Sequence, residues 1–255
     1  MKAMILAAGL GTRLRPLTDD RPKALVEVAG QTLLEITLSR LRAFGVREVV
    51  INVHHFADMV LEYLNAHDNF GMRIEISRED VLLDTGGGLK KAAHFFLRDG
   101  GNKGDEPFIL HNVDVLSSID LGEMVKLHRA QDGLATLAVQ QRESSRQLLF
   151  DERCELCGRR SNGDERAEMV RPAEPMQALA FCGIHVISPH IFGLLNEAGM
   201  GEAQAFPLIP AYLRMAGEGA KILAWRADRY YWRDLGTPAS LKQAAEDMEQ
   251  KVMEQ

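Results

Sequence analysis

The sequence predicts an α/β fold, in which helices flank a doubly wound, mixed but mostly parallel sheet. Short apolar runs alternate with segments of helical periodicity through the first half of the chain, and this alternation is typical of βαβ units. The connections are short, and a chain of 255 residues suits one α/β domain. We therefore expect a single domain, 1–255, made of two halves, 1–140 and 141–255, with a small β-hairpin insertion.

In the first half, the expected strands are apolar, as buried parallel strands are. The expected helices repeat large apolar residues every three to four positions, and Gly45 is the expected stop of the first helix. Strands are expected at 2–8, 47–53, 72–77, 106–115 and 134–140, and helices at 32–44, 56–67, 86–97 and 121–131. Ligands of such sheets bind beyond the carboxyl ends of the strands, so we expect the site at the loop after the first strand and at 112–114.

In the second half, the alternation is weaker. A hairpin, an irregular exposed segment, a long strand and a helix interrupted by prolines are expected, followed by two short strands and a C-terminal helix with Pro238 in its first turn. In this order, the ranges are 147–160, 161–176, 178–188, 203–217, 220–225, 229–236 and 238–255.

Composition excludes several classes of protein. The net charge of −6 argues against a nucleic-acid binder, which usually carries a basic surface. No apolar run approaches the ~18 residues that a membrane span needs, and the apolar N-terminal run is too short for a signal peptide. Three cysteines, an odd number, do not make a disulfide framework. We therefore expect a cytoplasmic protein that binds neither membranes nor nucleic acid.

A glycine-rich loop follows the first expected strand in the stretch MILAAGLGTRLRPLTDDRPKALV. Gly9 and Gly11 allow close approach of the backbone to a ligand and leave N–H groups to face anionic oxygens. Arg13 and Lys23 add positive charge, which suits a polyphosphate. The dinucleotide fingerprint fails because Leu14 replaces its third glycine, and no G-K-[ST] of a P-loop is present. A plain glycine turn between a strand and a helix is the alternative.

The same stretch resembles the signature L-A-x-G-x-G-[ST]-R-x-x-P-[LM]-T-x-x-x-P-K-x-[LM] of the sugar-1-phosphate nucleotidylyltransferases, which residues 6–25 match. The resemblance extends over the whole chain. It implies the Rossmann-like nucleotide-diphospho-sugar transferase fold, with a nucleotide-binding half at 1–140 and a sugar-binding half at 141–255. It also implies a reaction in which an NTP and a sugar 1-phosphate give an NDP-sugar and pyrophosphate.

The resemblance also implies a nucleotide site. Arg13 would hold the departing pyrophosphate and Lys23 would contact the α-phosphate region, so both are expected to be catalytic. Gly87 and Gly88, in LLDTGGGLKKA, would turn tightly against the base edge, although a glycine-rich helix start is also compatible with this stretch. The residues implied for nucleotide binding are Ala7, Ala8, Gly9, Gly11, Thr12, Arg13, Lys23, Gly87, Gly88 and Asn112.

Two aspartates resemble the metal ligands of the family. Asp114, in HNVDV, is expected to be a metal ligand and catalytic, although Val113 stands where glycine is frequent. Asp234, in YYWRDLGTPASL, matches W-x-D-x-G-[TK]-P. Mg²⁺ is usually held by one or two carboxylates and substrate phosphates, so we expect Mg²⁺ as the cofactor. An ordinary loop aspartate at 114 and a polar helix cap around 234 are the alternatives. A sugar phosphate is already an oxyanion at neutral pH, so no catalytic histidine or serine is expected.

The sugar site is implied by FCGIHVIS, in which Gly183 would lie against the sugar ring. Many relatives hold the sugar phosphate with a lysine in the middle of the chain, whereas this sequence has no lysine between Lys126 and Lys221. Arginines can grip a phosphate bidentately. The candidates for this role are Arg146, Arg159 and Arg160.

Two cysteine pairs with zinc-like spacing, Cys154-x-x-Cys157 and Cys182-x-x-His185, offer a competing metal site. Cys182 and His185 are three residues apart on an expected strand, so their side chains would point to opposite faces. We therefore expect no zinc centre.

The leading interpretation is an enzyme that uses UTP, with GTP as the next choice. It is similar to compact bacterial uridylyl- and guanylyltransferases of nucleotide-sugar and cell-envelope synthesis, and we expect a monomer or a homodimer. Two other interpretations stay open. One is a cytidylyltransferase for a non-sugar substrate such as phosphocholine, and the other is a non-catalytic nucleotide-sugar sensor on the same fold.

Overall fold

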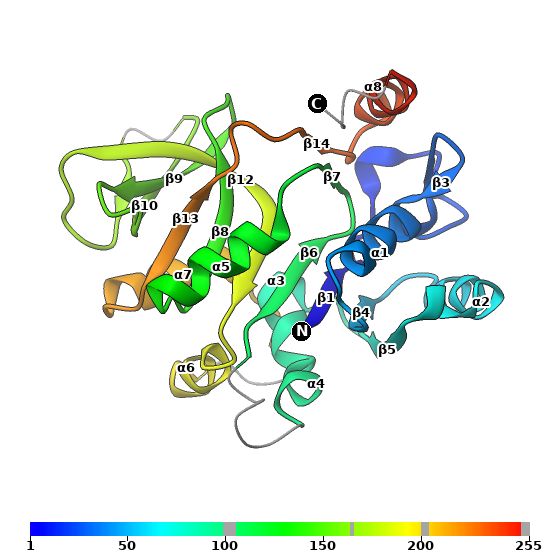
Figure 1. The fold of residues 1–255 in the computed structure, drawn as a ribbon, viewed down its shortest axis with the longest axis horizontal. Helices are drawn as coiled ribbons and strands as arrows, with labels where there is room; N and C mark the ends of the chain where they lie inside the picture. Colours follow the sequence, from blue (N-terminus) through cyan, green and yellow to red (C-terminus); the bar gives the residue numbers. More distant parts are fainter. Residues whose placement is uncertain (99–105, 164–165, 200–203, 251–255) are drawn as a thin grey trace.

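The computed structural model describes residues 1–98, 106–163, 166–199 and 204–250, which contain one ten-stranded sheet (Figure 1). Its strands are β1 (Lys2–Leu6), β4 (Glu48–Val53), β5 (Arg73–Arg78), β6 (Phe108–Asn112), β8 (Ala135–Gln140), β9 (Arg146–Asp151), β10 (Leu156–Ser161), β11 (Glu168–Met169), β12 (Met176–Ile187) and β13 (Ile222–Arg226). Their order is β11-β10-β9-β12-β6-β1-β4-β5, and β8 pairs with β12 and β13. Strands β1, β4, β5 and β6 pair in parallel, and β12 joins them antiparallel to β6.

Apolar clusters cover both faces of this sheet. Ala3 and Ile5 of β1 belong to one cluster, whereas Met4 between them belongs to the other. Helices α1 (Leu33–Ala43), α2 (Ala57–Ala66), α5 (Leu121–Gln131) and α8 (Pro238–Glu249) contribute to the first cluster, and α3 (Asp84–Lys91), α4 (Ala93–Leu97), α6 (Ile191–Glu197) and α7 (Leu208–Gly217) to the second. A strand buried on both faces reads as a continuous apolar run, so the α/β prediction is confirmed.

The helix expected at 86–97 differs from the observed one. It begins earlier, at Asp84, and it is divided into α3 and α4. The backbone N–H groups of Gly86 and Gly87 donate to the carbonyl oxygen of Phe206, at 2.9 and 3.3 Å. Glycine has a low intrinsic helix propensity, so these hydrogen bonds to Phe206 help to stabilise the first turn of α3. Sequence periodicity does not predict where such a turn begins.

The prediction that prolines interrupt the helix at 203–217 is wrong for the described part of that range. The helix α7 runs without a break, and Pro207 stands at its N-cap. Pro210 lies in its first turn. An N–H group in the first turn has no intrahelical acceptor, so proline is tolerated there.

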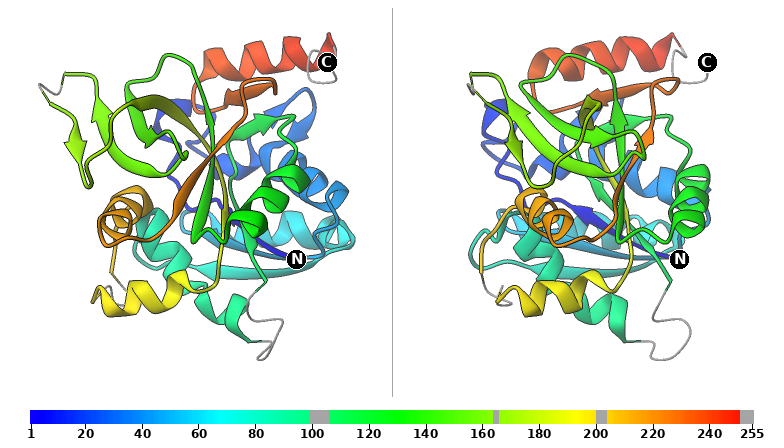
Figure 2. Two further views of the ribbon diagram at one scale, coloured as in Figure 1. Left: turned by 60° about the vertical axis from the view of Figure 1, so that its left-hand side comes forward. Right: turned by 90° about the vertical axis from the view of Figure 1, so that its left-hand side faces the viewer.

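The second half extends the sheet through the expected hairpin, which β9 and β10 form (Figure 2). The short strand β11, inside the segment expected to be irregular, pairs with β10. Strand β12 pairs with β9 at one end and with β6 at the other, and its pairing with β8 shifts between Phe181 and His185. Gly183 lies at this irregularity with a φ of +73°, a conformation that glycine adopts without strain.

Two small two-stranded sheets accompany the large one. Strand β7 (Val115–Ser117) pairs with β14 (Trp232–Asp234), and β2 (Glu27–Val28) pairs with β3 (Gln31–Thr32). Helix α8 follows β14 and lies beside it (Figure 2). Asp247 of α8 accepts hydrogen bonds from the Tyr231 hydroxyl at 2.6 Å and from Arg233 Nη2 at 2.8 Å. The C-terminal helix therefore holds β14, the strand that carries Asp234, in place.

Within the described ranges, no helix combines the length and the apolar character that a bilayer crossing requires.

Buried histidines make the stability of this fold depend on pH. Burial lowers the pKa of His128 to about 4 and that of His185 to about 3. In the unfolded chain a histidine titrates near pH ~6.5, so the unfolded state binds more protons as the pH falls. The stability that the neutral rings contribute is complete above pH ~6.5 and is lost as the pH falls toward the folded-state pKa values.

We expect the free energy of unfolding, measured by urea denaturation, to fall between pH ~6.5 and ~5 by on the order of 1.4 kcal/mol per pH unit for each of these histidines. His185→Gln removes one titrating group and should flatten the dependence. His67→Gln, at an exposed histidine, should leave it unchanged. A slope that His185→Gln does not alter would contradict this origin of the pH dependence.

Candidate active site

The carboxyl ends of three parallel strands meet at one level of the sheet. Leu6 at the end of β1 is paired with Asn52 of β4 on one side and with Asn112 of β6 on the other. A cavity of about 470 Å³ opens there. It is lined by residues 6–9, Lys23, Asn52, Leu82, Asp84, Thr85, residues 112–114 and Ala205. The predicted position of the site, beyond the carboxyl ends of the strands, matches this cavity.

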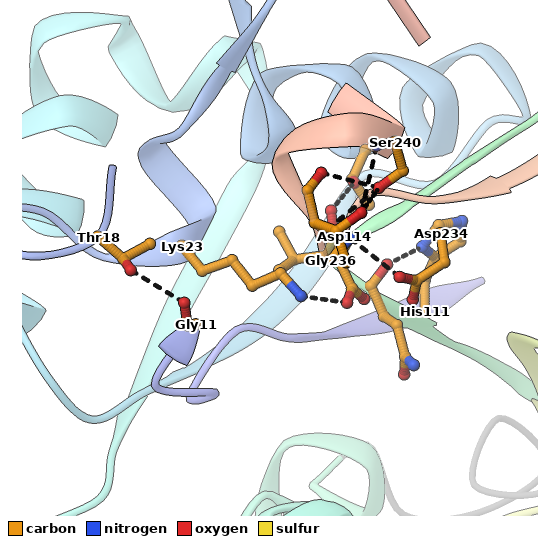
Figure 3. Close-up of polar contacts among 12 residues, drawn as sticks. Gly11, Thr18, Lys23, His111, Asp114, Asp234, Gly236 and Ser240 are labelled. Atoms are coloured by element: carbon orange, nitrogen blue, oxygen red, sulfur yellow. Dashed lines mark hydrogen bonds and ion pairs between the residues drawn. The ribbon is translucent and has the colours of Figure 1, made fainter. Parts of the chain in front are cut away.

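The glycine-rich loop folds back on itself beside this cavity. Gly11 has a φ of +64°, and a β-carbon on it would lie 2.9 Å from Thr18 Cγ2 and 3.2 Å from Lys23 Cβ. The Thr18 hydroxyl donates to the carbonyl oxygen of Gly11 at 2.9 Å (Figure 3). Leu14, fully buried, anchors the 3₁₀ turn Thr12–Leu14 in the core. The loop needs glycine at position 11 for its conformation and for its own packing.

Lys23 and Asp114 form an ion pair at the edge of the cavity, between Nζ and Oδ2 (Figure 3). The exposed fractions of their side chains are 11% and 16%, so the pair is largely shielded from water. Lys23 opens the 3₁₀ turn Lys23–Leu25, whose other residues are buried. Asp114 lies in the turn between β6 and β7. Both side chains are thus placed by buried neighbours, and the structure brings these two predicted residues together.

Asp234 reaches the same place through the pairing of β7 with β14. Its register partner is Val115, and the N–H of Leu235 donates to the backbone oxygen of Asp114 at 2.8 Å. The Asp234 carboxylate accepts a hydrogen bond from the N–H of Gly236 at 2.9 Å (Figure 3). The two predicted metal ligands, far apart in the sequence, are therefore on adjacent paired segments.

Arg13 and Asp234 both lie against Gly236. A β-carbon on Gly236 would be 2.6 Å from Arg13 Nη2 and 2.6 Å from Asp234 Oδ1. The guanidinium of the glycine-rich loop therefore extends to the segment that carries the second aspartate. Glycine at 236 is needed because these two charged groups occupy the space of a side chain.

The sequence predicts that Arg13 holds pyrophosphate, so displacement of its guanidinium by ~1 Å in Gly236→Ala should lower turnover by about 100-fold. The melting temperature should change little, because the displaced atoms are the ends of side chains. Pyrophosphate release and thermal unfolding measure the two effects. Gly193→Ala is the matched control, since its β-carbon would meet no atom within 4 Å. Full turnover in Gly236→Ala would show that Arg13 and Asp234 do not need these positions.

Gly87 and Gly88 do not line the cavity. A β-carbon on Gly87 would collide with the backbone oxygen of Gln204, and one on Gly88 would lie 2.7 Å from both Asn52 Nδ2 and Glu79 Oε1. These glycines therefore allow close packing behind the cavity wall, and their contact with a nucleotide base stays a prediction. Sequence reasoning missed the wall residues Asn52, Leu82, Asp84, Thr85 and Ala205. A polar residue at a strand end was the available signal for Asn52.

Gly183 lies directly beside the cavity-lining strand. A β-carbon on it would be 2.8 Å from Val115 Cγ2 and 3.0 Å from Asn112 Nδ2. Glycine is therefore already required here by packing within the protein. Its expected contact with a sugar ring, adjacent to Asn112, stays a prediction.

The arginines expected at the sugar site lie on the β9–β10 hairpin and do not line the cavity. Arg146 is exposed, Arg160 Nη2 donates to Gln147 Oε1 at 2.9 Å, and Arg159 pairs with Glu168. Sequence reasoning did not consider a fourth arginine, Arg142, which lies closer to β14.

Arg142 stacks on the strand that carries Asp234. Its guanidinium carbon is 3.8 Å from the centre of the Trp232 ring, and its Nη2 donates to the carbonyl oxygen of Phe181 at 2.8 Å. The Trp232 indole N–H donates to the carbonyl oxygen of Cys182 at 2.7 Å. Arg142 and Trp232 thus join β14 to the part of β12 that precedes Gly183.

The zinc-like residues face different surroundings, as expected. Cys182 belongs to the first apolar cluster, whereas His185 pairs with the Tyr212 hydroxyl at 3.2 Å in the second. Burial raises the pKa of the Cys182 thiol to about 12, so this side chain is a neutral core residue at physiological pH. Over the described parts of the chain, no three His, Cys, Asp or Glu side chains are grouped to hold a metal ion.

The chain is similar in sequence and in fold to proteins of known class. The Nucleotidyl transferase family model matches residues 2–150. N-acetylmuramate α-1-phosphate uridylyltransferase of Caulobacter vibrioides is 36% identical over 252 residues, which cover 96% of this chain and 95% of that protein. Fold, site and similarity together define an enzyme of the nucleotidyltransferase class. The chain belongs to the nucleotidyl transferase family, so the resemblance seen in the sequence is confirmed.

Two further proteins extend this comparison. Mannose-1-phosphate guanylyltransferase 1 of Arabidopsis thaliana is 30% identical over 243 residues, or 93% of this chain and 62% of that protein. The crystal structure of apo UDP-glucose pyrophosphorylase superimposes with a TM-score of 0.76 at 19% identity, over 99% of this chain and 100% of that one. The structural similarity confirms the expected nucleotide-diphospho-sugar transferase fold.

Proposed function

We propose that this protein joins an NTP to a sugar 1-phosphate, giving an NDP-sugar and pyrophosphate. The observation that carries the proposal is the Lys23–Asp114 pair beside Asp234, at the edge of a cavity of about 470 Å³. A cavity of this volume is within the usual range for small-molecule sites. The similarity to a uridylyltransferase over nearly the whole of both chains supports it.

Asp114 and Asp234 fit a magnesium ion, which we propose as the cofactor. Both offer carboxylate oxygens, the ligands that Mg²⁺ prefers, and substrate phosphates would complete its coordination. In support of this proposal, the Asp114 carboxylate already pairs with a positive group, the ammonium of Lys23. When bound, the ion would neutralise phosphate charge and help to align the two substrates.

The residues of the chain supply binding and electrostatic stabilisation. We propose that the glycine-rich loop binds the triphosphate and that Lys23 leaves Asp114 to contact the α-phosphate. An oxygen of the sugar phosphate attacks the α-phosphorus, and the bond to the bridging oxygen of pyrophosphate breaks. Negative charge develops on that leaving group, where Arg13 would stabilise it. The attacking oxygen is already ionised, so no residue needs to remove a proton.

The substrates are a finer proposal. We propose UTP as the nucleotide, since the relative that matches over most of both chains is named a uridylyltransferase, and GTP as the alternative, which the Arabidopsis relative supports. For the sugar phosphate, Arg146 and Arg160 remain proposed ligands, although Arg142 is the arginine that contacts Trp232, in the strand that carries Asp234. We further propose a single domain that acts in the cytoplasm as a monomer or a homodimer.

The test is pyrophosphate release with Mg²⁺, across four NTPs and a panel of sugar 1-phosphates that includes N-acetylmuramate and mannose 1-phosphates, with phosphocholine added. We expect release with UTP and one sugar 1-phosphate. Release with CTP and phosphocholine alone would replace the proposal by the cytidylyltransferase alternative. Nucleotide binding without release from any pair would replace it by the sensor alternative.

A further inference from the structure

A buried chain of hydrogen bonds begins at Ala7 and Asn52, which line the cavity, and continues to Glu79 and Leu83, which do not. Asn52 Oδ1 accepts from the N–H of Ala7 at 2.7 Å, and Asn52 Nδ2 donates to Glu79 Oε1 at 2.7 Å. Glu79 Oε2 accepts from the N–H of Leu83 at 2.9 Å. The chain connects the end of β1, from which the glycine-rich loop departs, with the segment that precedes α3. These two segments form different walls of the cavity.

Glu79 is an unusual member of this chain because it is a buried carboxylate. Its exposed fraction is 3%, and that of Asn52 is 2%. Among the described residues, no lysine, arginine or histidine side chain forms an ion pair with Glu79. Burial of a carboxylate without a cation costs free energy, so a carboxylate at this position needs a role that an amide or an apolar side chain cannot fill.

The role of the Glu79 carboxylate follows from the direction of the hydrogen bonds. Both ends of the chain, Ala7 and Leu83, are backbone N–H donors. The two side chains between them must therefore offer an acceptor to each of these N–H groups. Where the two side chains meet, one must donate and the other must accept. Asn52 and Glu79 meet these conditions, whereas two amides always leave one donor facing another, because each has a single acceptor atom.

The nearby glycine makes room for this pair. A β-carbon on Gly88 would lie 2.7 Å from both Asn52 Nδ2 and Glu79 Oε1. Gly88 therefore allows α3 to approach the hydrogen bond between the two side chains. This packing explains why glycine is required at position 88 without any contact between Gly88 and a nucleotide base.

We propose that Glu79 is a positioning residue of the nucleotide site: it orients the Asn52 amide and thereby holds the Ala7 end of β1 and the 82–85 wall at their separation. The proposal rests on the proposed function, because it takes the cavity to be the nucleotide site. Glu79 does not line the cavity, so it acts through Asn52 and Leu83 and not by contact with substrate.

The test exchanges the amide and the carboxylate. Glu79→Gln places a donor against a donor, and we expect the Kd of the NTP–Mg²⁺ complex to rise about 10-fold or more, as the loss of a hydrogen bond to a charged group predicts. Asn52→Asp brings two carboxylates together and should be at least as harmful. The double variant Asn52→Asp/Glu79→Gln restores an acceptor at each end and one donor between, so it should bind the NTP more tightly than either single variant.

Two readouts separate this role from a general loss of stability. The KM for the NTP should rise in Glu79→Gln while the KM for the sugar 1-phosphate stays unchanged. Asp151→Asn is the matched control: Asp151 accepts backbone bonds from Arg153 and Glu155 at 2.9 Å in the hairpin, away from the cavity. We expect this variant to lose stability and keep its nucleotide affinity.

A double variant no better than Glu79→Gln would overturn the proposal, as would an unchanged Kd in Glu79→Gln. Amide hydrogen exchange at Ala7 and Leu83 tests the chain without ligand, since both amides should lose protection in Glu79→Gln and regain it in the double variant. If the wild-type protein bound an NTP but released pyrophosphate with no combination of NTP and sugar 1-phosphate, only the proposed function would be contradicted. The nucleotide affinities of the variants would still decide the role of Glu79.

Discussion

Asp114→Asn should lower the rate of pyrophosphate release by about 1,000-fold, the scale of removing a major electrostatic contact from a transition state. Asparagine has nearly the same shape, and its oxygen can still accept from Lys23, so the fold should survive. The loss of charge should also weaken the binding of Mn²⁺, used as a probe for Mg²⁺. Steady-state kinetics and Mn²⁺ titration by electron paramagnetic resonance measure both effects.

Asp120→Asn is the control for this variant. Asp120 is the N-cap of α5, and its carboxylate accepts from the N–H of Glu123 at 2.9 Å. Asparagine caps a helix about as well as aspartate, so stability and turnover should both be retained. Wild-type turnover in Asp114→Asn would refute the role of Asp114 as a metal ligand.

Lys23→Ala should also lower the rate of turnover by about 100-fold or more, because it removes a fixed positive charge that is proposed to contact the reacting phosphate. Its effect on Mn²⁺ affinity should be opposite in sign to the effect of Asp114→Asn. In the free enzyme the Lys23 ammonium is bound to the Asp114 carboxylate, so it competes with a cation for that group. Without it, the nucleotide-free protein should bind Mn²⁺ more tightly, by ~10-fold on the scale of a partly shielded charge pair.

Lys126→Ala removes an equal charge from the exposed surface of α5, where the side chain is 78% exposed. This control should alter neither turnover nor Mn²⁺ binding. If Lys23→Ala lost turnover while Mn²⁺ binding was unchanged, Lys23 would act on the phosphate without competing for Asp114. If it kept full turnover, its proposed contact with the α-phosphate would be wrong.

Local chemistry explains why the loop was predictable from the sequence. The glycines and cations of residues 9–23 lie close together in the chain, so their spacing alone indicates an anion-binding loop. The positions of Asp114 and Asp234 were inferred from resemblance to the family, and pairing of β7 with β14 is what makes them neighbours. A hydrogen bond between segments so distant in sequence leaves no periodic signal in either of them.

The errors in the predicted elements have the same origin. Pro210 was expected to break α7, but its place in the first turn makes it harmless. The start of α3 was misplaced because its glycines are supported by Phe206 and not by helix propensity. Both errors concern the residue at which a helix begins. Helix propensity predicts this boundary poorly.

The sequence by itself determined the α/β class, the position of the glycine-rich loop and the family, because apolar periodicity and a contiguous motif encode them locally. Only the tertiary structure decided which groups are partners: Lys23 with Asp114, Arg13 beside Gly236, and Asn52 with Glu79. Such partners are set when buried segments pack, since most polar groups removed from water form a hydrogen bond there. That requirement acts on the folded chain as a whole, and no short stretch of sequence contains it.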